Sequence, residues 1–224
     1  MVTSPDVGRA FRVVPRHLFV PDSDLANAYR DEVIFTKSRN GISLSASSAP
    51  SIMAEMLELL AVKPGHRVLE VGAGTGYNAA LMEEIVGPGG HVVTLDIDQD
   101  IVHEAITHLR TAQRGEHITV RCGDGGLGWP EGAPYDRIIV ATGAWDMPPA
   151  WFRQLADGGR LLLLERSVTP GARGLARHGL DDEESEGLVE TLGAMGFGGV
   201  ERQTHRAGRR TLVVISATAL PRAA

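Results

Sequence analysis

Val68–Asn78 reads VLEVGAGTGYN, which combines an apolar run, a glycine-rich turn and the beginning of a helical pattern. The run Arg67–Val71 follows the turn signal Pro64-Gly65 and suits a strand that is buried on both faces. Glycines at alternate positions of the turn allow a sharp bend and a close approach of a ligand to the backbone. Tyr77–Ile85 is apolar at helical spacing, so free N–H groups at a helix start face the same ligand. The segment therefore predicts a strand–turn–helix unit that binds a small molecule.

The spacing of the glycines indicates the class of ligand. A dinucleotide fingerprint requires G-x-G-x-x-G, but the third position counted from Gly72 falls on Tyr77. The motif present is E-x-G-x-G-x-G, which is typical of S-adenosylmethionine (SAM) methyltransferases. We expect Glu70 to meet the cationic side of SAM and the amides of the turn to meet its carboxylate. The residues predicted to line this end of the cofactor site are Glu70, Gly72, Ala73, Gly74 and Asn78. The alternative is a turn that only packs the strand on the helix.

The rest of the chain alternates between strand and helix patterns, as expected for an α/β protein with a doubly wound, Rossmann-like parallel sheet. Strands are predicted at His91–Leu95, Ile118–Cys122, Tyr135–Val140 and Arg160–Leu164. Helices are predicted at Ser51–Leu60, Asp98–Ala112, Pro149–Leu155 and Glu184–Gly196. Val200–His205 and Thr211–Ala217 are expected to close the sheet as a strand hairpin, and residues 166–183 to form an exposed loop or lid.

Acidic residues follow two of the predicted strands. Asp96-Ile97 ends the second strand and Asp124-Gly125 follows the third. A carboxylate only accepts hydrogen bonds and therefore suits the ribose diol, which we assign to Asp96. Asp124 is expected beside the adenine amino group. Together with the glycine turn, these residues predict an adenosine site at the carboxyl edge of the sheet.

Residues 1–62 are predicted to form a small N-terminal helical cap with an acceptor-side loop. Residues 63–224 are predicted to form the SAM-binding core, with the whole chain as a single compact unit. Residues 31–49 are rich in Ser, Thr, Asn and Gly, so they are expected to be a polar loop. Pro50 suits the first turn of a helix, with Ser48 near its N-cap. Such a loop can supply donors for an anionic substrate.

The composition limits the classes of function. The chain has 224 residues, 43% of them hydrophobic, and a formal net charge of −6. This charge balance disfavours a nucleic-acid partner, because binding phosphates requires a basic surface. No apolar run approaches a membrane span, and the N-terminus lacks a signal-peptide pattern. The single cysteine, Cys122, excludes a disulfide framework and a Cys-cluster metal site, and no metal is expected. It is predicted to be an inert core thiol, and the protein to be cytoplasmic.

Several segments beyond the glycine motif are characteristic of one family. They are VPRHLFVP at Val14–Pro21, SAPSIMA at Ser48–Ala54, GDG at Gly123–Gly125 and GWPE at Gly128–Glu131. With these segments the chain resembles the protein-L-isoaspartate (D-aspartate) O-methyltransferase family over roughly residues 14–165. The resemblance implies a SAM-dependent carboxyl O-methyltransferase that esterifies an isoaspartyl or aspartyl carboxylate in a protein or peptide.

The resemblance also assigns the acceptor side. Ser48 occupies the serine position of the family's S-x-P segment, so it is expected to bind or orient the acceptor carboxylate as the catalytic residue. The predicted substrate-binding residues are Thr36, Lys37, Ser47 and Ser48. The segment Phe35–Ser47 departs from the family pattern and resembles that of divergent members that methylate aspartate in ribosomally made peptides. The alternatives that stay open are such a maturation enzyme, a methyltransferase of a small molecule, and a SAM-binding protein without turnover. The sequence does not determine the oligomeric state.

Overall fold

The computed structural model describes residues 2–144, 147–166, 182–195, 197–207 and 210–221. The predicted loop or lid at 166–183 falls largely outside these residues. The described helices are α1 (Pro5–Val13), α2 (Leu25–Ala28), α3 (Pro50–Leu60), α4 (Tyr77–Val86), α5 (Gln99–Thr111), α6 (Pro149–Gln154) and α7 (Asp182–Ala194). The strands are β1 (Ile34–Arg39), β2 (Ile42–Ser47), β3 (Arg67–Val71), β4 (His91–Asp96), β5 (Ile118–Cys122), β6 (Tyr135–Val140), β7 (Leu155–Arg166), β8 (Phe197–Ala207) and β9 (Arg210–Ala219). The 3₁₀ helix η1 spans Arg16–Phe19.

The main sheet has seven strands in the order β5-β4-β3-β6-β7-β9-β8. The strands β3 to β7 pair in parallel, and β9 runs antiparallel to both β7 and β8. The predicted doubly wound sheet with a terminal hairpin is therefore confirmed. The strand order reverses between β3 and β6, and ligands of open α/β sheets bind at the carboxyl edge beside such a point.

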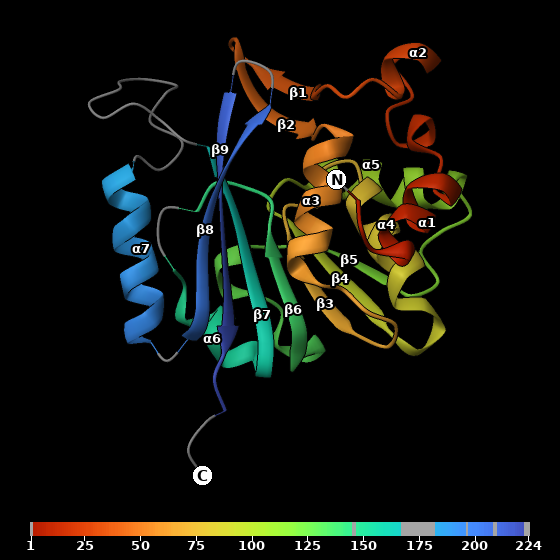
Figure 1. The fold of residues 1–224 in the computed structure, drawn as a ribbon. Helices are drawn as coiled ribbons and strands as arrows, with labels where there is room; N and C mark the ends of the chain where they lie inside the picture. Colours follow the sequence, from red (N-terminus) through yellow and green to blue (C-terminus); the bar gives the residue numbers. More distant parts are fainter. Residues whose placement is uncertain (1, 145–146, 167–181, 196, 208–209, 222–224) are drawn as a thin grey trace.

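Two hydrophobic clusters cover the two faces of the sheet. One includes Phe19, Leu57 and Tyr77 and packs α1, α3 and α4 on one face. The other includes Trp151 and Leu192, from α6 and α7, on the opposite face. Figure 1 shows α7 on one side of the strands and the N-terminal helices on the other. Both faces of β3 are thus buried, which explains its continuous apolar pattern.

The polar segment before α3 is an antiparallel hairpin rather than a loop. Strands β1 and β2 pair from Ile34↔Ser47 to Arg39↔Ile42. Asn40 and Gly41 connect them with positive φ values of 52° and 76°, as in the tight turns that Asn-Gly pairs favour. The serine-rich composition concealed this turn signal.

Two further expectations are wrong. Helix α3 has Ala49 as its N-cap residue with no side-chain cap, so Ser48 does not cap it. The carboxylate of Asp31 accepts from the Ser51 amide at 2.9 Å instead, which satisfies a free N–H of the first turn. Cys122 is exposed rather than a core thiol, because it ends the edge strand β5, which the helices cover only in part.

Candidate cofactor and acceptor site

Two adjoining cavities lie at the carboxyl edge of the sheet, beside the ends of the neighbouring strands β3 and β6. The smaller, of about 200 Å³, is lined by Glu70, Asn78, the glycine turn and the hairpin end with Ser47 and Ser48. The larger, of about 450 Å³, is lined by Asp96, Ile97, Asp124, Gly125 and Trp151 among others. The walls that both share are Leu44, Gly72, Asp96 and Thr142. One elongated ligand can therefore extend from the glycine turn to the end of β5.

Glu70 is buried beneath the smaller cavity, with 1% of its surface exposed. Its carboxylate accepts from the Thr94 hydroxyl at 2.6 Å and from Asn78 Nδ2 at 2.7 Å. Burial raises the pKa of Glu70 to about 7, against the opposing effect of these two hydrogen bonds. Because a buried carboxylate is stabilised by a nearby positive charge, this position favours a cationic group of a ligand in the cavity.

Asn78 supplies a second acceptor in the same place. Its Nδ2 is used by Glu70, and its Oδ1 is buried without a hydrogen-bond partner among the described residues. Buried acceptors are normally paired. An ammonium group in the smaller cavity would satisfy Asn78 Oδ1 and face Glu70, so these residues fit the amino end of SAM.

The amides of the glycine turn form hydrogen bonds within the protein. The expectation that they bind the carboxylate of SAM is therefore wrong for three of them. The amides of Gly72 and Ala73 both donate to the Leu95 carbonyl at 2.8 and 2.9 Å, and the Gly74 amide donates to Asp96 at 3.1 Å. These three amides are therefore not available to the carboxylate of SAM. Among the described residues, the Thr75 amide has no partner, so it is the better candidate donor.

Gly72 is needed instead because of its backbone conformation and because a side chain would not fit there. Gly72 has a φ of +100°, and a Cβ there would lie 3.2 Å from Cβ of Thr142. A side chain at this position would be strained and would crowd the shared wall of the two cavities.

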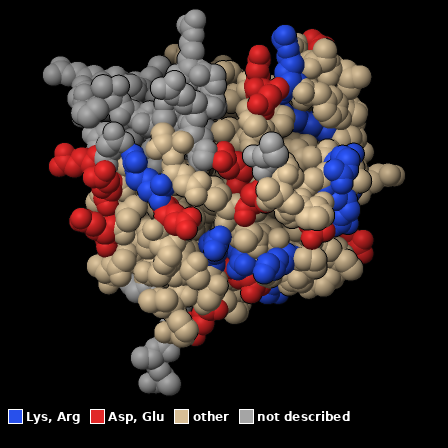
Figure 2. Space-filling model, viewed as in Figure 1, with Lys and Arg blue, Asp and Glu red and all other residues tan. Residues whose placement is uncertain are grey.

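The larger cavity carries the residues expected around adenosine. Asp96 accepts from the amides of Gly74 and Asp98, and burial raises its pKa despite those bonds. Ile97 is 72% exposed beside it, as an apolar surface open to a flat ring. Asp124 accepts from the Gly126 amide through Oδ1, which leaves Oδ2 without a partner among the described residues. Figure 2 shows acidic and basic side chains interspersed on one face of the molecule.

The predicted acceptor residues fall into two groups. Ser47 and Ser48 line the smaller cavity together with Glu70 and Asn78. Thr36 and Lys37 lie on β1, and neither is among the residues lining the two cavities. The Thr36 hydroxyl bonds across the hairpin to Ser45 at 3.3 Å. Their role with the substrate stays a prediction.

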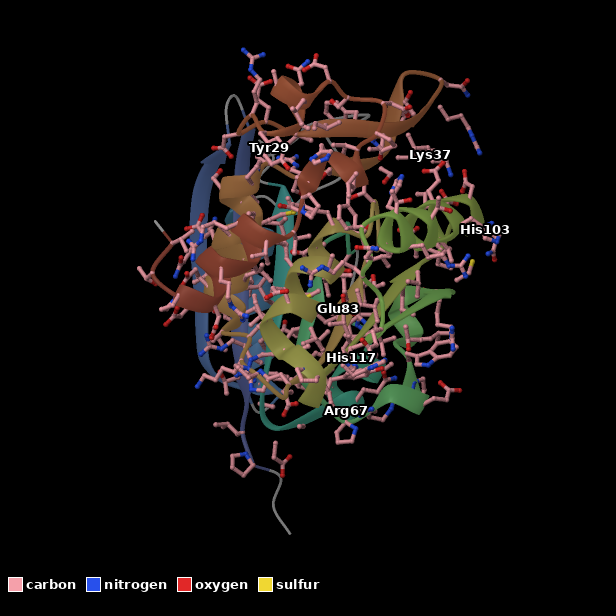
Figure 3. The ribbon with its side chains drawn as sticks, turned by 90° about the vertical axis from the view of Figure 1, so that its right-hand side faces the viewer. Tyr29, Lys37, Arg67, Glu83, His103 and His117 are labelled. Atoms are coloured by element: carbon pink, nitrogen blue, oxygen red, sulfur yellow. The ribbon has the colours of Figure 1, made fainter. Side chains whose placement is uncertain are left out.

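Lys37 connects the hairpin to the cofactor side. Its Nζ lies 2.8 Å from carboxylate oxygens of both Asp98 and Asp100, at the start of α5. Figure 3 shows Lys37 on the hairpin above this helix. These hydrogen bonds raise the pKa of Lys37, and the lysine lowers the pKa of Asp100. The ion pairs hold the hairpin, whose residues 44–48 form a wall of the smaller cavity.

Three residues of this region were not predicted. Thr94 stands inside the apolar pattern of β4, a position where a polar residue indicates a buried hydrogen bond. Thr142 follows β6 and lines both cavities; its place after a parallel strand was the available signal. Leu44 carries no signal in the sequence, because the hairpin that positions it is formed by a segment whose composition predicts a loop.

Among known proteins, the model of one family, described as "Protein-L-isoaspartate(D-aspartate) O-methyltransferase (PCMT)", matches residues 1–167. A protein of Methanopyrus kandleri named protein-L-isoaspartate O-methyltransferase is 40% identical over 162 residues, which cover 72% of this chain and 70% of the relative. One of the same name from Methanothrix thermoacetophila is 38% identical over 197 residues, covering 87% and 91%.

Solved structures agree with these sequence matches. A protein-L-isoaspartate O-methyltransferase structure has a TM-score of 0.67 at 38% identity and covers 71% of this chain. This chain spans about half the length of that protein, since the match covers 50% of it. A structure from Plasmodium falciparum in complex with S-adenosyl-L-homocysteine (SAH) has a TM-score of 0.61 at 20% identity, covering 72% of this chain and 77% of that one; it shows the fold alone.

Proposed function

We propose that this chain, which belongs to the protein-L-isoaspartate (D-aspartate) O-methyltransferase family, methylates a side-chain carboxylate of an isoaspartyl or aspartyl residue in a protein or peptide. It is a SAM-dependent methyltransferase of the Rossmann-like class. The observation that carries the proposal is that Ser47 and Ser48 line the same cavity as Glu70 and Asn78. The acceptor-side serines therefore lie beside the predicted amino end of the cofactor site.

The proposed cofactor contacts follow from the geometry of the two cavities. Glu70 and Asn78 Oδ1 bind the ammonium group and the Thr75 amide binds the carboxylate. Asp96 binds the ribose diol, while Ile97, Asp124 and Gly125 surround the adenine. Gly72, Ala73 and Gly74 form the wall along which the ligand lies.

Methyl transfer to a carboxylate requires little proton transfer by the protein. SAM supplies a methyl group activated by its sulfonium, and an acceptor carboxylate is already ionised at neutral pH. The contribution of the chain is therefore to align the carboxylate and to exclude water. The Ser48 hydroxyl has no hydrogen-bond partner among the described residues and lines the cavity, so we assign it to the acceptor oxygen. Residues 1–62 supply this acceptor side, and residues 63–224 the cofactor side, of one compact unit.

The proposal includes partners and location. The described residues contain no helix long and apolar enough to cross a membrane. We propose a protein or peptide substrate, with no nucleic-acid partner, and a cytoplasmic site of action, which suits a chain with a single cysteine.

A methyl-transfer assay tests the proposal. The purified protein receives labelled SAM together with an isoaspartyl peptide, its aspartyl twin, or carboxamide versions of both. Base-labile methyl incorporation into a carboxylate peptide, and none into the carboxamides, is expected. Incorporation into the isoaspartyl peptide alone indicates repair, and incorporation into the aspartyl peptide indicates modification of a defined aspartate. Methylation of the carboxamides, or of neither carboxylate while SAH still binds, contradicts the proposed substrate class.

A further inference from the structure

Arg16 is a fully buried arginine beneath the acceptor side of the site. It begins η1, directly after Pro15, and is 1% exposed. Its guanidinium lies 5.9 Å from the ring centre of Tyr77, at the start of α4. The side chain therefore lies between the N-terminal cap, the hairpin end and the glycine-turn helix.

All hydrogen-bond acceptors of Arg16 are uncharged. Its Nη1 donates to the carbonyl of Arg30 at 3.4 Å. Its Nη2 has two hydrogens, which three acceptors share: the carbonyls of Ser48 at 3.0 Å and Glu32 at 3.3 Å, and the Ser47 hydroxyl at 3.4 Å. The Nε atom is buried without a partner among the described residues. Three carbonyls and one hydroxyl satisfy part of the guanidinium but leave its charge unpaired.

No carboxylate of the described residues forms an ion pair with Arg16. Asp31 is close enough to raise the pKa of Arg16, but it uses its Oδ1 to accept from the Ser51 amide. Burial has the larger, opposite effect and lowers the pKa of Arg16. A buried cation without a carboxylate partner is costly, and a bound anion would stabilise it.

The two serines that Arg16 contacts are the ones that line the smaller cavity. A hydroxyl has a single hydrogen to donate. Because Ser47 Oγ accepts from Arg16, its own O–H is available to another acceptor, and the charged donor behind it strengthens that bond. The Ser48 carbonyl is fixed by the same Nη2 atom, which orients the residue whose hydroxyl lines the cavity.

We propose that Arg16 is a positioning residue that makes the acceptor subsite selective for a carboxylate. Its charge acts through the Ser47 hydroxyl, and its hydrogen bond to the Ser48 carbonyl fixes the backbone of the acceptor segment. An uncharged carboxamide gains little from this arrangement. The inference rests on the proposed function, because it concerns the acceptor of that reaction.

The test measures peptide binding to the SAH-saturated protein, so that it does not depend on turnover. Fluorescence anisotropy gives the Kd of a labelled carboxylate peptide and of its carboxamide twin. The wild-type protein is expected to prefer the carboxylate by roughly tenfold, the effect of one hydrogen bond to a charged group. Arg16→Met should remove most of this preference, and Arg16→Lys should keep part of it, because lysine retains the charge.

Two controls separate positioning from a general structural effect. Arg9→Met removes an arginine of the same cap that pairs with Glu84 on the surface, and it should leave the preference unchanged. The Kd of SAH should change less than the Kd of the carboxylate peptide in Arg16→Met, since Arg16 itself lines neither cavity, although its neighbour Tyr77 lines the smaller one. In a double-mutant cycle, Ser47→Ala should add little to Arg16→Met, because both remove the same contact to the acceptor.

Ser47→Ala also provides the test if Arg16→Met fails to fold, and it should lose the same preference. Wild-type protein that binds both peptides equally, or folded Arg16→Met that retains the full preference, overturns the inference. An unchanged preference in Ser47→Ala, or independent effects of the two substitutions, also overturns it. A failure of the proposed function would instead leave peptide selectivity intact while no methyl group is transferred.

Discussion

Glu70→Gln tests the assignment of the cofactor's ammonium group. The substitution keeps the shape of the side chain but removes the charge. The glutamine oxygen can still accept from Asn78 Nδ2, and its NH2 group can donate to the Thr94 hydroxyl, which reverses the bond that Glu70 accepts. A hydrogen bond to a charged group contributes about 1.5–3 kcal/mol, so SAH should bind roughly ten- to a hundredfold more weakly at pH 8. Isothermal titration calorimetry measures this affinity.

The pH dependence gives the sharper result. Burial raises the pKa of Glu70 to about 7 in the free protein, and the ligand's ammonium requires the ionised form. The ionised fraction falls roughly tenfold from pH 8 to pH 6, so the affinity of the wild-type protein for SAH should fall by about that factor. The affinity of Glu70→Gln should change little over this range. Glu131→Gln, at an exposed carboxyl outside both cavities, should behave like wild type.

The stability of the ligand-free protein depends on pH in the opposite direction from its affinity for SAH. The unfolded chain loses the Glu70 proton near its ordinary pKa of 4.5 and the folded protein near 7. Because the folded protein binds more protons between these values, its free energy of unfolding falls as the pH rises through this window. The difference corresponds to ~3 kcal/mol. Without ligand, Glu70→Gln should therefore unfold at a higher temperature than wild type at pH 8, and this advantage should shrink towards pH 5.

Two outcomes would refute the reasoning. One is a wild-type affinity for SAH that does not vary between pH 6 and 8. The other is a Glu70→Gln protein that binds SAH as tightly as wild type at pH 8. Either result would mean that Glu70 does not contact a charged group of the ligand.

Three further substitutions test the proposed ribose contact, the proposed acceptor contact and the restraint on the hairpin separately. Asp96→Asn should weaken SAH binding roughly tenfold, because it removes a charged acceptor for the ribose. An unchanged Kd in calorimetry would show that Asp96 does not bind the ribose. Ser48→Ala should lower kcat about ten- to a hundredfold while the Kd of SAH stays the same; equal losses in both would indicate a structural role. Lys37→Met should speed SAH release in stopped-flow fluorescence, because it removes the ion pairs with Asp98 and Asp100 that hold the hairpin. The increase should be only roughly two- to fivefold, since such partly exposed pairs are weak, and the release rate should depend less on salt than in wild type. Identical release rates in both proteins would exclude such a restraint.

Local patterns in the sequence determined the cofactor half of this protein. The strand Arg67–Val71 has the predicted bounds, because a strand covered on both faces must be apolar throughout. The acids Asp96 and Asp124 could be placed at one edge of the sheet because parallel strands bring their carboxyl ends together. The assignment of E-x-G-x-G-x-G to a SAM-dependent family required only the spacing of residues that are neighbours in the chain.

The structure of the proposed acceptor half depends on contacts between residues that are distant in the chain. The serine-rich composition of residues 31–49 conceals the Asn40-Gly41 turn and predicts a loop, where the structure has a hairpin. The cap of α3 comes from Asp31, 20 residues before its partner Ser51. No local pattern contains such a pairing.

Only the tertiary structure decided which charges are paired. Lys37 meets Asp98 61 positions along the chain, whereas Arg16 reaches Ser47 and Ser48 and has no carboxylate partner among the described residues. Burial and pairing depend on how the cap and the hairpin pack on the sheet, and the same arginine would be unremarkable on the surface. The sequence by itself indicated a SAM-dependent methyltransferase, and the packing of the N-terminal cap determined where a buried positive charge lies beside the proposed acceptor site.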